Sequence, residues 1–323
     1  MEKQRHPVSG VDYPGTFQKF DEWFNTEAAC LDYITKIRWP KGFICPSCGL
    51  AAEKPSSMGR GLFLCRKCKR QTSVTARTLF HRVHKPLRTW FLAMWFVTSQ
   101  KHGASALGLQ RVLGLGSYNT AWNWLHKLRR VMVRPGRDQL TGPIEVDETY
   151  VGGIGKQVRG RGAKRKTIVA IAAEIRGRGT GRIRMSVIPD VSSASIHEFI
   201  LNSVGKGATI HSDGWSGYKG IELLGYRHLV TNISDGGDPA HVVMPRVHRV
   251  ASLLDRWWLG IHQGAIRPSH LEYYLDEFTF RFNRRTSRAR GLLFYRLMEQ
   301  AVGSAPVTRQ MIIGGQPQHN GAG

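Results

Sequence analysis

Acidic residues are scarce in this sequence of 323 residues, which contains 23 Asp and Glu against 47 Lys and Arg. The formal charge of +24 makes nucleic acid the expected partner of the protein. Between Lys54 and Arg137 there is no acidic residue at all, although 17 Lys and Arg occur there. Because an ordinary solvated surface mixes both signs, this stretch predicts a surface that attracts phosphate backbones without reading their sequence.

Long apolar runs are missing too. The longest, Trp90 to Val97, is far shorter than the ~20 residues that a membrane-spanning helix needs. Residues Met1 to Pro14 lack the apolar segment of a secretory signal. With 41% hydrophobic residues the chain can nevertheless bury a core, which excludes wholesale disorder. We therefore expect a soluble intracellular protein without a membrane partner.

Cysteine is also rare, but four of the five cysteines form two pairs, Cys45-Pro-Ser-Cys48 and Cys65-Arg-Lys-Cys68, with 16 residues between the pairs. A two-residue gap lets both thiolates of a pair reach one tetrahedral metal ion. A disulfide would need an oxidising compartment, which nothing in the chain indicates, and a redox motif would explain only one pair. The pattern therefore predicts a zinc ribbon with a structural zinc ion, and Cys30 is interpreted as a small buried residue.

Two short helical patterns follow the cysteines and are separated by Gly114. Ser105 and Ser117 precede these patterns as candidate N-caps, which is typical of a helix-turn-helix. The second helix would present polar and basic side chains to DNA: Asn119, Asn123, Lys127, Arg129 and Arg130. Many helical hairpins that do not bind DNA share this pattern, so the absence of acidic residues around it is what favours DNA.

The pattern changes after a Pro- and Gly-containing linker near residue 140. Period-two and β-rich stretches predict strands, and serine-led apolar patterns predict helices. The order is three strands, a helix, two strands and three helices, which is that of an RNase H-like domain. We therefore predict a multidomain α+β protein with five segments: an N-terminal helical segment (1–41), the zinc ribbon (42–80), the helix-turn-helix region (81–137), an RNase H-like α/β catalytic domain (143–302) and a flexible tail (303–323).

Two carboxylates of this last domain are candidates for chemistry. Asp147 lies within a predicted strand on the same face as Glu145, and Asp213 directly follows another predicted strand. Singly, Asp147 could be a surface residue and Asp213 a turn residue. Together, on neighbouring strands of a basic protein, they predict bound divalent metal, because two metal ions can promote phosphoryl transfer. Mg²⁺ is the default, since carboxylate oxygens suit hard cations.

At this point the motifs resemble those of bacterial insertion-sequence transposases of the zinc-ribbon DDE branch. The resemblance covers about residues 17 to 302 and rests on the cysteine pairs and on five further segments: 86–91 (PLRTWF), 144–153 (IEVDETYVGG), 211–218 (HSDGWSGY), 245–250 (PRVHRV) and 278–285 (FTFRFNRR). It implies an RNase H-like fold, binding of the element ends, metal-dependent DNA strand cleavage and strand transfer, and Mg²⁺ or Mn²⁺ as the catalytic cofactor.

The resemblance also implies three metal ligands, of which Asp147 and Asp213 are the first two. The third position, a Glu in most DDE enzymes, matches His248 here. Seven residues later stands Asp255, where the family places a basic residue, which puts the activity of this copy in doubt. The rival third ligand is Glu277, whose alternative interpretation is an exposed helix residue paired with Arg281.

We expect double-stranded DNA, both element ends and target, as the partner, and no small-molecule substrate. Joining two ends requires at least two protomers, so a homo-oligomer on DNA is expected, in the cytoplasm and associated with the bacterial nucleoid. Further backbone contacts are predicted at Lys164, Arg165, Lys166, Arg284 and Arg285. The alternatives are a zinc-ribbon DNA-binding regulator without catalysis, which leaves Asp147 and Asp213 without a role, and a nuclease of the same fold.

Overall fold

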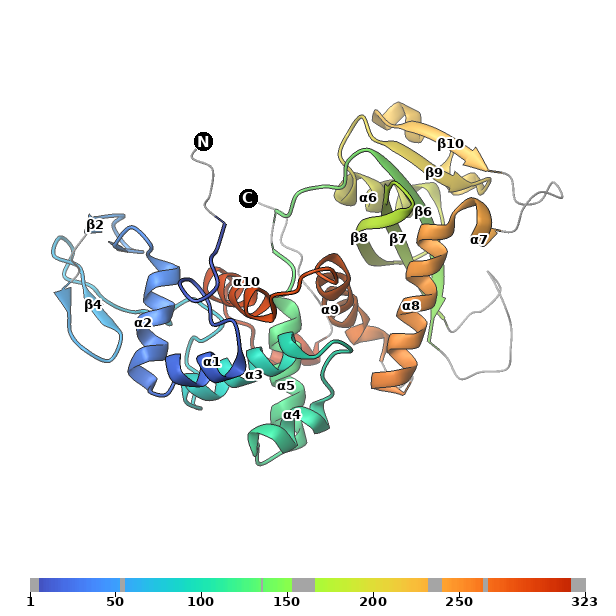
Figure 1. Cartoon of the computed structure of the whole chain (residues 1–323). Coiled ribbons are helices and arrows are strands. Elements are labelled where there is room, and N and C mark those ends of the chain that lie inside the picture. The colour runs from blue at the N-terminus through green and yellow to red at the C-terminus, as the bar shows by residue number, and fades with distance from the viewer. Residues whose placement is uncertain are drawn as a thin grey trace. The chain divides into compact units, whose positions relative to one another are not determined.

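The computed structural model describes residues 6–52, 56–134, 136–152, 166–231, 240–263 and 267–314. They form two compact units (Figure 1). The helical unit combines the chain up to Arg134 with residues 287–314, and the sheet unit spans residues 135–286.

The helical unit contains short helices and the small strands of the cysteine region. Its elements are α1 (Phe17–Trp23), α2 (Glu27–Arg38), β1 (Phe43–Ile44), β2 (Ala51–Ala52), β3 (Ser56–Ser57), β4 (Leu62–Leu64), β5 (Gln71–Ser73), α3 (Leu87–Ser99), α4 (Ala106–Leu113), α5 (Tyr118–Arg130), α10 (Arg290–Gly303) and α11 (Arg309–Ile313). β1 pairs with β2, and β3, β4 and β5 form a second antiparallel sheet.

Aromatic side chains from distant parts of the sequence form the core of this unit. Phe294 of α10 is fully buried and packs against Phe20 of α1 and Phe91 of α3, with ring centroids 5.4 and 5.9 Å apart. At Gly291 a Cβ atom would lie 1.8 Å from the carbonyl oxygen of Pro14, so only glycine permits this close approach. The sequence-based boundary, which placed residues 290–302 in the catalytic domain, thus differs from the structure, because the apolar face of α10 completes the helical core.

The predicted flexible tail also begins too early. Residues 309–313 form α11, whose N-cap Thr308 accepts a hydrogen bond from the Met311 amide and whose Ile312 is fully buried. This buried apolar side chain holds the segment in the helical unit. Residues 315–323 lie outside the described part of the chain.

The sheet unit contains five strands and the helices on their two faces. Its elements are β6 (Pro143–Val151), β7 (Thr167–Arg176), β8 (Gly179–Ile188), α6 (Ser193–Ser203), β9 (Thr209–Asp213), η1 (Ser216–Tyr218), η2 (Ile221–Leu224), β10 (Arg227–Thr231), α7 (Ala240–Val243), α8 (Pro245–His262), η3 (Pro268–His270) and α9 (Leu271–Asn283). The strand order is β10-β9-β6-β7-β8. β6, β7 and β8 are antiparallel, whereas β9 and β10 run parallel to β6. This order and these directions are those of an RNase H-like domain, the fold that the sequence predicted.

Alternation along the strands gives the sheet two buried faces. Ile144 and Val146 of β6 pack in one core with α6. Val151 of β6 belongs to the other core, which α8 and α9 cover. Residues 145, 147 and 149 therefore point to the α8 side of the sheet, where Figure 1 shows α8 running along the strands.

Candidate active site and metal centres

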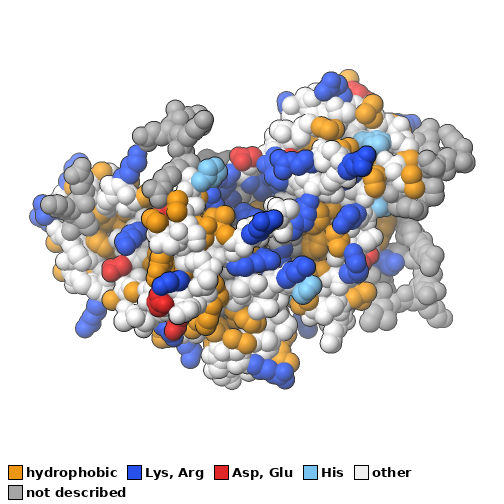
Figure 2. Space-filling model, viewed as in Figure 1, with side chains coloured by type: hydrophobic (Ala, Val, Ile, Leu, Met, Phe, Trp, Pro, Cys, Tyr) orange, Lys and Arg blue, Asp and Glu red, His pale blue; other side chains and the backbone are white. Residues whose placement is uncertain are grey.

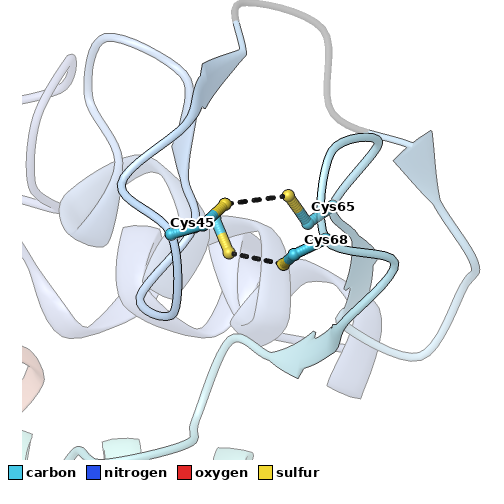
Figure 3. A group of neighbouring side chains, drawn as sticks. Cys45, Cys65 and Cys68 are labelled. Carbon is cyan, nitrogen blue, oxygen red and sulfur yellow. Dashed lines mark hydrogen bonds between the residues drawn. The ribbon is translucent and has the colours of Figure 1, made fainter.

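The four paired cysteines converge on one point in the helical unit (Figure 3). Their sulfur atoms all lie within 4.8 Å of one another, and the Sγ atoms of Cys45 and Cys68 are 3.7 Å apart. Within the described part of the chain they are the only set of three or more metal-binding side chains that already converges in this way. Four thiolates fill a tetrahedral zinc shell and leave no open position, so this centre fits a structural zinc ion.

Each cysteine pair is formed by the same kind of turn. The Gly49 amide donates to the carbonyl oxygen of Cys45, and the Lys69 amide donates to that of Cys65. Both residues have positive φ, 71° at Gly49 and 57° at Lys69, so Lys69 adopts at some energetic cost a conformation that glycine adopts freely. The amides inside the second turn, first that of Cys68, lower the pKa of Cys65 to about 6. Zinc binds the thiolate form of cysteine, and a lowered pKa favours this form.

Cys30 takes no part in this centre. It is completely buried in α2, and burial raises its pKa to about 12. The interpretation of Cys30 as a small buried residue is confirmed.

The two predicted aspartates lie on adjacent strands of the sheet unit, β6 and β9. β6 and β9 are parallel, with Glu145 opposite His211. Asp147 and Asp213 each follow this last paired position by two residues. Asp213 is the last residue of β9 rather than the residue after the strand. Asp147 is in the middle of β6 and Asp213 is at the carboxyl end of β9, and carboxylates on two neighbouring strands can hold metal ions that act on one phosphodiester.

Short-range hydrogen bonds hold both aspartates. The Glu148 amide donates to Oδ1 of Asp147 at 2.9 Å, and the Trp215 amide donates to Oδ1 of Asp213 at 3.0 Å. Burial of Tyr218, together with the charges of Glu148, Asp147 and Asp213, raises the pKa of its hydroxyl well above the ordinary value. The two aspartates therefore share one electrostatic environment around Tyr218.

His248 lies beside the first of these aspartates. It stands in the first turns of α8, and its Nε2 is 3.7 Å from Oδ2 of Asp147. The two side chains are 31% and 21% exposed, although Nε2 of His248 itself is buried. Imidazole next to carboxylate oxygen suits Mn²⁺ better than an all-oxygen site does.

Glu277, the rival ligand, belongs to α9. Its side chain is 1% exposed, and Oε1 accepts hydrogen bonds from Nε and Nη2 of Arg281 at 2.9 and 2.7 Å. The expected pairing with Arg281 is confirmed, whereas the expected exposure is wrong, because α9 covers the sheet and buries this face. α9 packs on β8, two strands away from β6 in the sheet order.

Asp255, the unexpected acid, is exposed on α8. Lys166 lies close enough for its charge to lower the pKa of Asp255, although desolvation raises that pKa more. Lys166 was predicted to contact DNA, and here it acts on a neighbouring carboxylate. Lys164 and Arg165, from the same prediction, lie outside the described residues.

The sequence analysis did not assign roles to three further groups around Asp147. Glu145 is fully buried and contacts the start of α8 through Arg246. Oε1 of Glu148 accepts a hydrogen bond from the hydroxyl of buried Tyr218 at 2.5 Å. Glu145 and Glu148 flank Asp147 in a chain with few acidic residues, and this local concentration could have indicated from the sequence that they support Asp147.

The helix-turn-helix prediction agrees with the structure in its helices and caps. Ser105 and Ser117 cap α4 and α5 with their side chains, and Gly114 ends α4 in the left-handed region. Arg129 is only 2% exposed, and this burial does not fit its prediction as a DNA contact. Asn119 is exposed on α5, and the side chains of Asn123, Lys127 and Arg130 are partly exposed.

The predicted basic contacts at the end of α9 are engaged within the sheet unit. Arg284 stacks over Phe280, with its guanidinium carbon 4.1 Å from the ring centroid. Arg285 donates to the carbonyl oxygens of Thr180 and Gly181 in β8. Figure 2 shows Lys and Arg side chains spread over the visible face of the molecule, with few Asp and Glu among them.

Comparison with known proteins matches these features to known families. Residues 139–283 match the model of the ISXO2-like transposase domain, and residues 25–71 match that of the transposase zinc-ribbon domain. This chain is an insertion-sequence transposase of the zinc-ribbon DDE branch. A Halobacterium salinarum protein described as "Uncharacterized protein in transposable element ISH50" is 29% identical over 283 residues, which cover 80% of the transposase and 91% of that protein.

Two solved structures were also found. The catalytic core domain of BIV integrase matches with a TM-score of 0.28 and 20% identity, over 42% of the transposase and 81% of that chain. A chain of the simian T-cell lymphotropic virus intasome in complex with PP2A regulatory subunit B56 gamma matches with a TM-score of 0.29 and 14% identity, over 58% and 65%. The RNase H-like assignment rests on the order and direction of the five strands. In the described part of the transposase, every helix is too short or too polar to cross a membrane.

Proposed function

We propose that this transposase cleaves DNA strands at the ends of its element and joins the freed 3′-hydroxyls to target DNA, using Asp147, Asp213 and His248. The observation that carries the proposal is that β6, β9 and α8 each contribute one of these three side chains. The adjacent parallel strands β6 and β9 carry the two aspartates, each two residues beyond the last paired position, and α8 brings His248 to 3.7 Å from Asp147.

The three side chains fit a pair of divalent metal ions. Asp147 and Asp213 offer oxygen ligands, and His248 offers a nitrogen while its imidazole is neutral. When bound, two such ions would activate the attacking oxygen and stabilise the leaving oxygen of the phosphodiester. With one carboxylate fewer than a DDE site, this ligand set carries a formal charge of about −2, which favours use of Mn²⁺.

The surroundings of these residues support their roles. The buried hydroxyl of Tyr218 stays protonated, because burial and the neighbouring carboxylates raise its pKa, and it holds Glu148 as a hydrogen-bond donor. Glu148 in turn donates its amide to Asp147. Asp147 is thereby held at a fixed orientation before any ligand arrives, which is how an active site avoids reorganising during the reaction.

Binding to the element ends is assigned to the helical unit. Asn119 lies on the exposed N-terminal turn of α5, the part of a recognition helix that contacts base edges. Lys127 and Arg130 follow at positions suited to phosphate contacts. Because two ends must be cut and joined together, the active form on DNA is a homo-oligomer, and we place it at the nucleoid.

A DNA-cleavage assay with oligonucleotides carrying the ends of the flanking inverted repeats tests the proposal. Asp147→Asn and Asp213→Asn should each abolish cleavage but bind these DNAs as wild type does, because the proposed DNA contacts lie on other elements. Wild-type cleavage by either variant would refute the assignment. Cleavage by the wild-type protein without joined products would indicate the nuclease alternative.

A further inference from the structure

The N-terminus of α8 lacks a cap from its own sequence. Helix starts leave several backbone N–H groups without helical partners, and a Ser, Thr, Asp or Asn usually bonds them. Here the N-cap residue is Met244, which makes no side-chain cap hydrogen bond. Pro245 follows and has no N–H. The amides of Arg246 and Val247 are therefore the first that need acceptors.

Glu145 of β6 supplies these acceptors from a distance of about one hundred residues in sequence. Its Oε2 accepts from the Arg246 amide at 2.6 Å and from the Val247 amide at 3.0 Å, and its Oε1 accepts from Nη1 of Arg246 at 3.2 Å. The carboxylate is 0% exposed. A negative charge at this position also interacts favourably with the helix dipole.

This contact ties two proposed metal ligands together. Asp147 is two residues after Glu145 on the same strand and the same face. His248 is the residue directly after Val247. We propose that Glu145 is a positioning residue, which fixes the start of α8 on β6 and thereby sets the distance between His248 and Asp147. The inference rests on the proposed function, because it requires His248 to be a ligand.

The sheet unit contains a second contact between a helix and a strand that involves none of the proposed metal ligands, and this contact serves as a control. Glu272 lies in the first turn of α9, and its Oε1 accepts from the Val187 amide at 2.5 Å and from the Ser186 hydroxyl at 3.1 Å. It therefore ties a helix to strand β8 as Glu145 ties α8 to β6. Loss of Glu272 should cost folding stability but leave the metal site unchanged.

The test uses full-length protein loaded with Mn²⁺, with zinc retained in the ribbon. Electron spin echo measurements detect the magnetic coupling of a ligated imidazole nitrogen to Mn²⁺, and a titration gives the Mn²⁺ affinity. Wild type should show the nitrogen coupling, and His248→Ala should lose it. Glu145→Leu should lose the coupling and about 10- to 100-fold in Mn²⁺ affinity, the usual effect of removing an outer partner of a metal ligand.

Glu145→Gln should be affected less, because one oxygen can still accept from both amides while its NH₂ group faces Arg246. Glu272→Leu and Glu272→Gln should keep the wild-type coupling and affinity even if they melt earlier. The inference fails if both Glu145 variants match wild type, or if the Glu272 variants lose as much affinity. Should Glu145→Leu not fold, the same comparison between the two Gln variants decides. Absence of the coupling from wild type would instead refute His248 as a ligand, and the inference with it.

Discussion

The hydrogen bond from Tyr218 to Glu148 should stabilise both the fold and the active site. Tyr218 is 1% exposed, and its hydroxyl donates to a carboxylate at 2.5 Å. Hydrogen bonds to charged groups contribute about 1.5–3 kcal/mol. Tyr218→Phe should therefore lower the melting temperature by about 3–12 °C, since 1 kcal/mol corresponds to about 2–4 °C in a unit of this size.

Tyr226 offers a matched control in the same core. It is 4% exposed and donates to the neutral carbonyl oxygen of Val204 at 2.9 Å, a bond that contributes about 0.5–1.5 kcal/mol. Tyr226→Phe should thus destabilise the protein about half as much. Only Tyr218→Phe should slow DNA cleavage by folded protein, because Glu148 bonds Asp147. Equal melting temperatures and equal cleavage rates in the two variants would refute this reasoning.

Two further predictions concern the helical unit. Cys45→Ser and Cys68→Ser should each lose the zinc, about one ion per chain, and unfold the ribbon, because the binding energy of such sites is folding energy. Cys30→Ala is the control and should keep the zinc. Elemental analysis measures the zinc content of all three variants. Arg130→Gln should weaken DNA binding and lower its salt dependence by about one phosphate contact. Arg129→Gln should instead lower the melting temperature, since Arg129 is buried. If salt titrations showed a lower salt dependence for Arg129→Gln but not for Arg130→Gln, the assignment of α5 as the DNA-contacting helix would be refuted.

Features that depend on interactions between neighbouring residues, such as helix caps, were predicted well from the sequence. Ser105 and Ser117 cap α4 and α5 as expected, because an N-cap acts within three residues. The order of strands and helices along the chain also followed from the sequence, since alternation marks strands and this order is characteristic of one fold. Convergence of the four cysteines followed from their spacing alone.

Contacts between distant segments could not be predicted in the same way. The apolar face of α10 could fill either core, and only the aromatic partners of Phe294 show which one it completes. Arg129 has a basic side chain in a basic helix, so its burial depends on how α5 packs. The partner of Glu145 lies 101 residues away, and no local pattern joins β6 to the start of α8.

The central claim is that the third ligand is on α8 and not on α9. Cleavage assays in Mn²⁺ with His248→Ala and with the double variant Glu277→Met/Arg281→Met test it directly. Replacing both members of the buried pair avoids leaving one buried charge without its partner, so the double variant should fold. We predict that His248→Ala loses cleavage and that the double variant retains it. Retained cleavage in His248→Ala, with loss in the folded double variant, would contradict the account and assign the third ligand to Glu277.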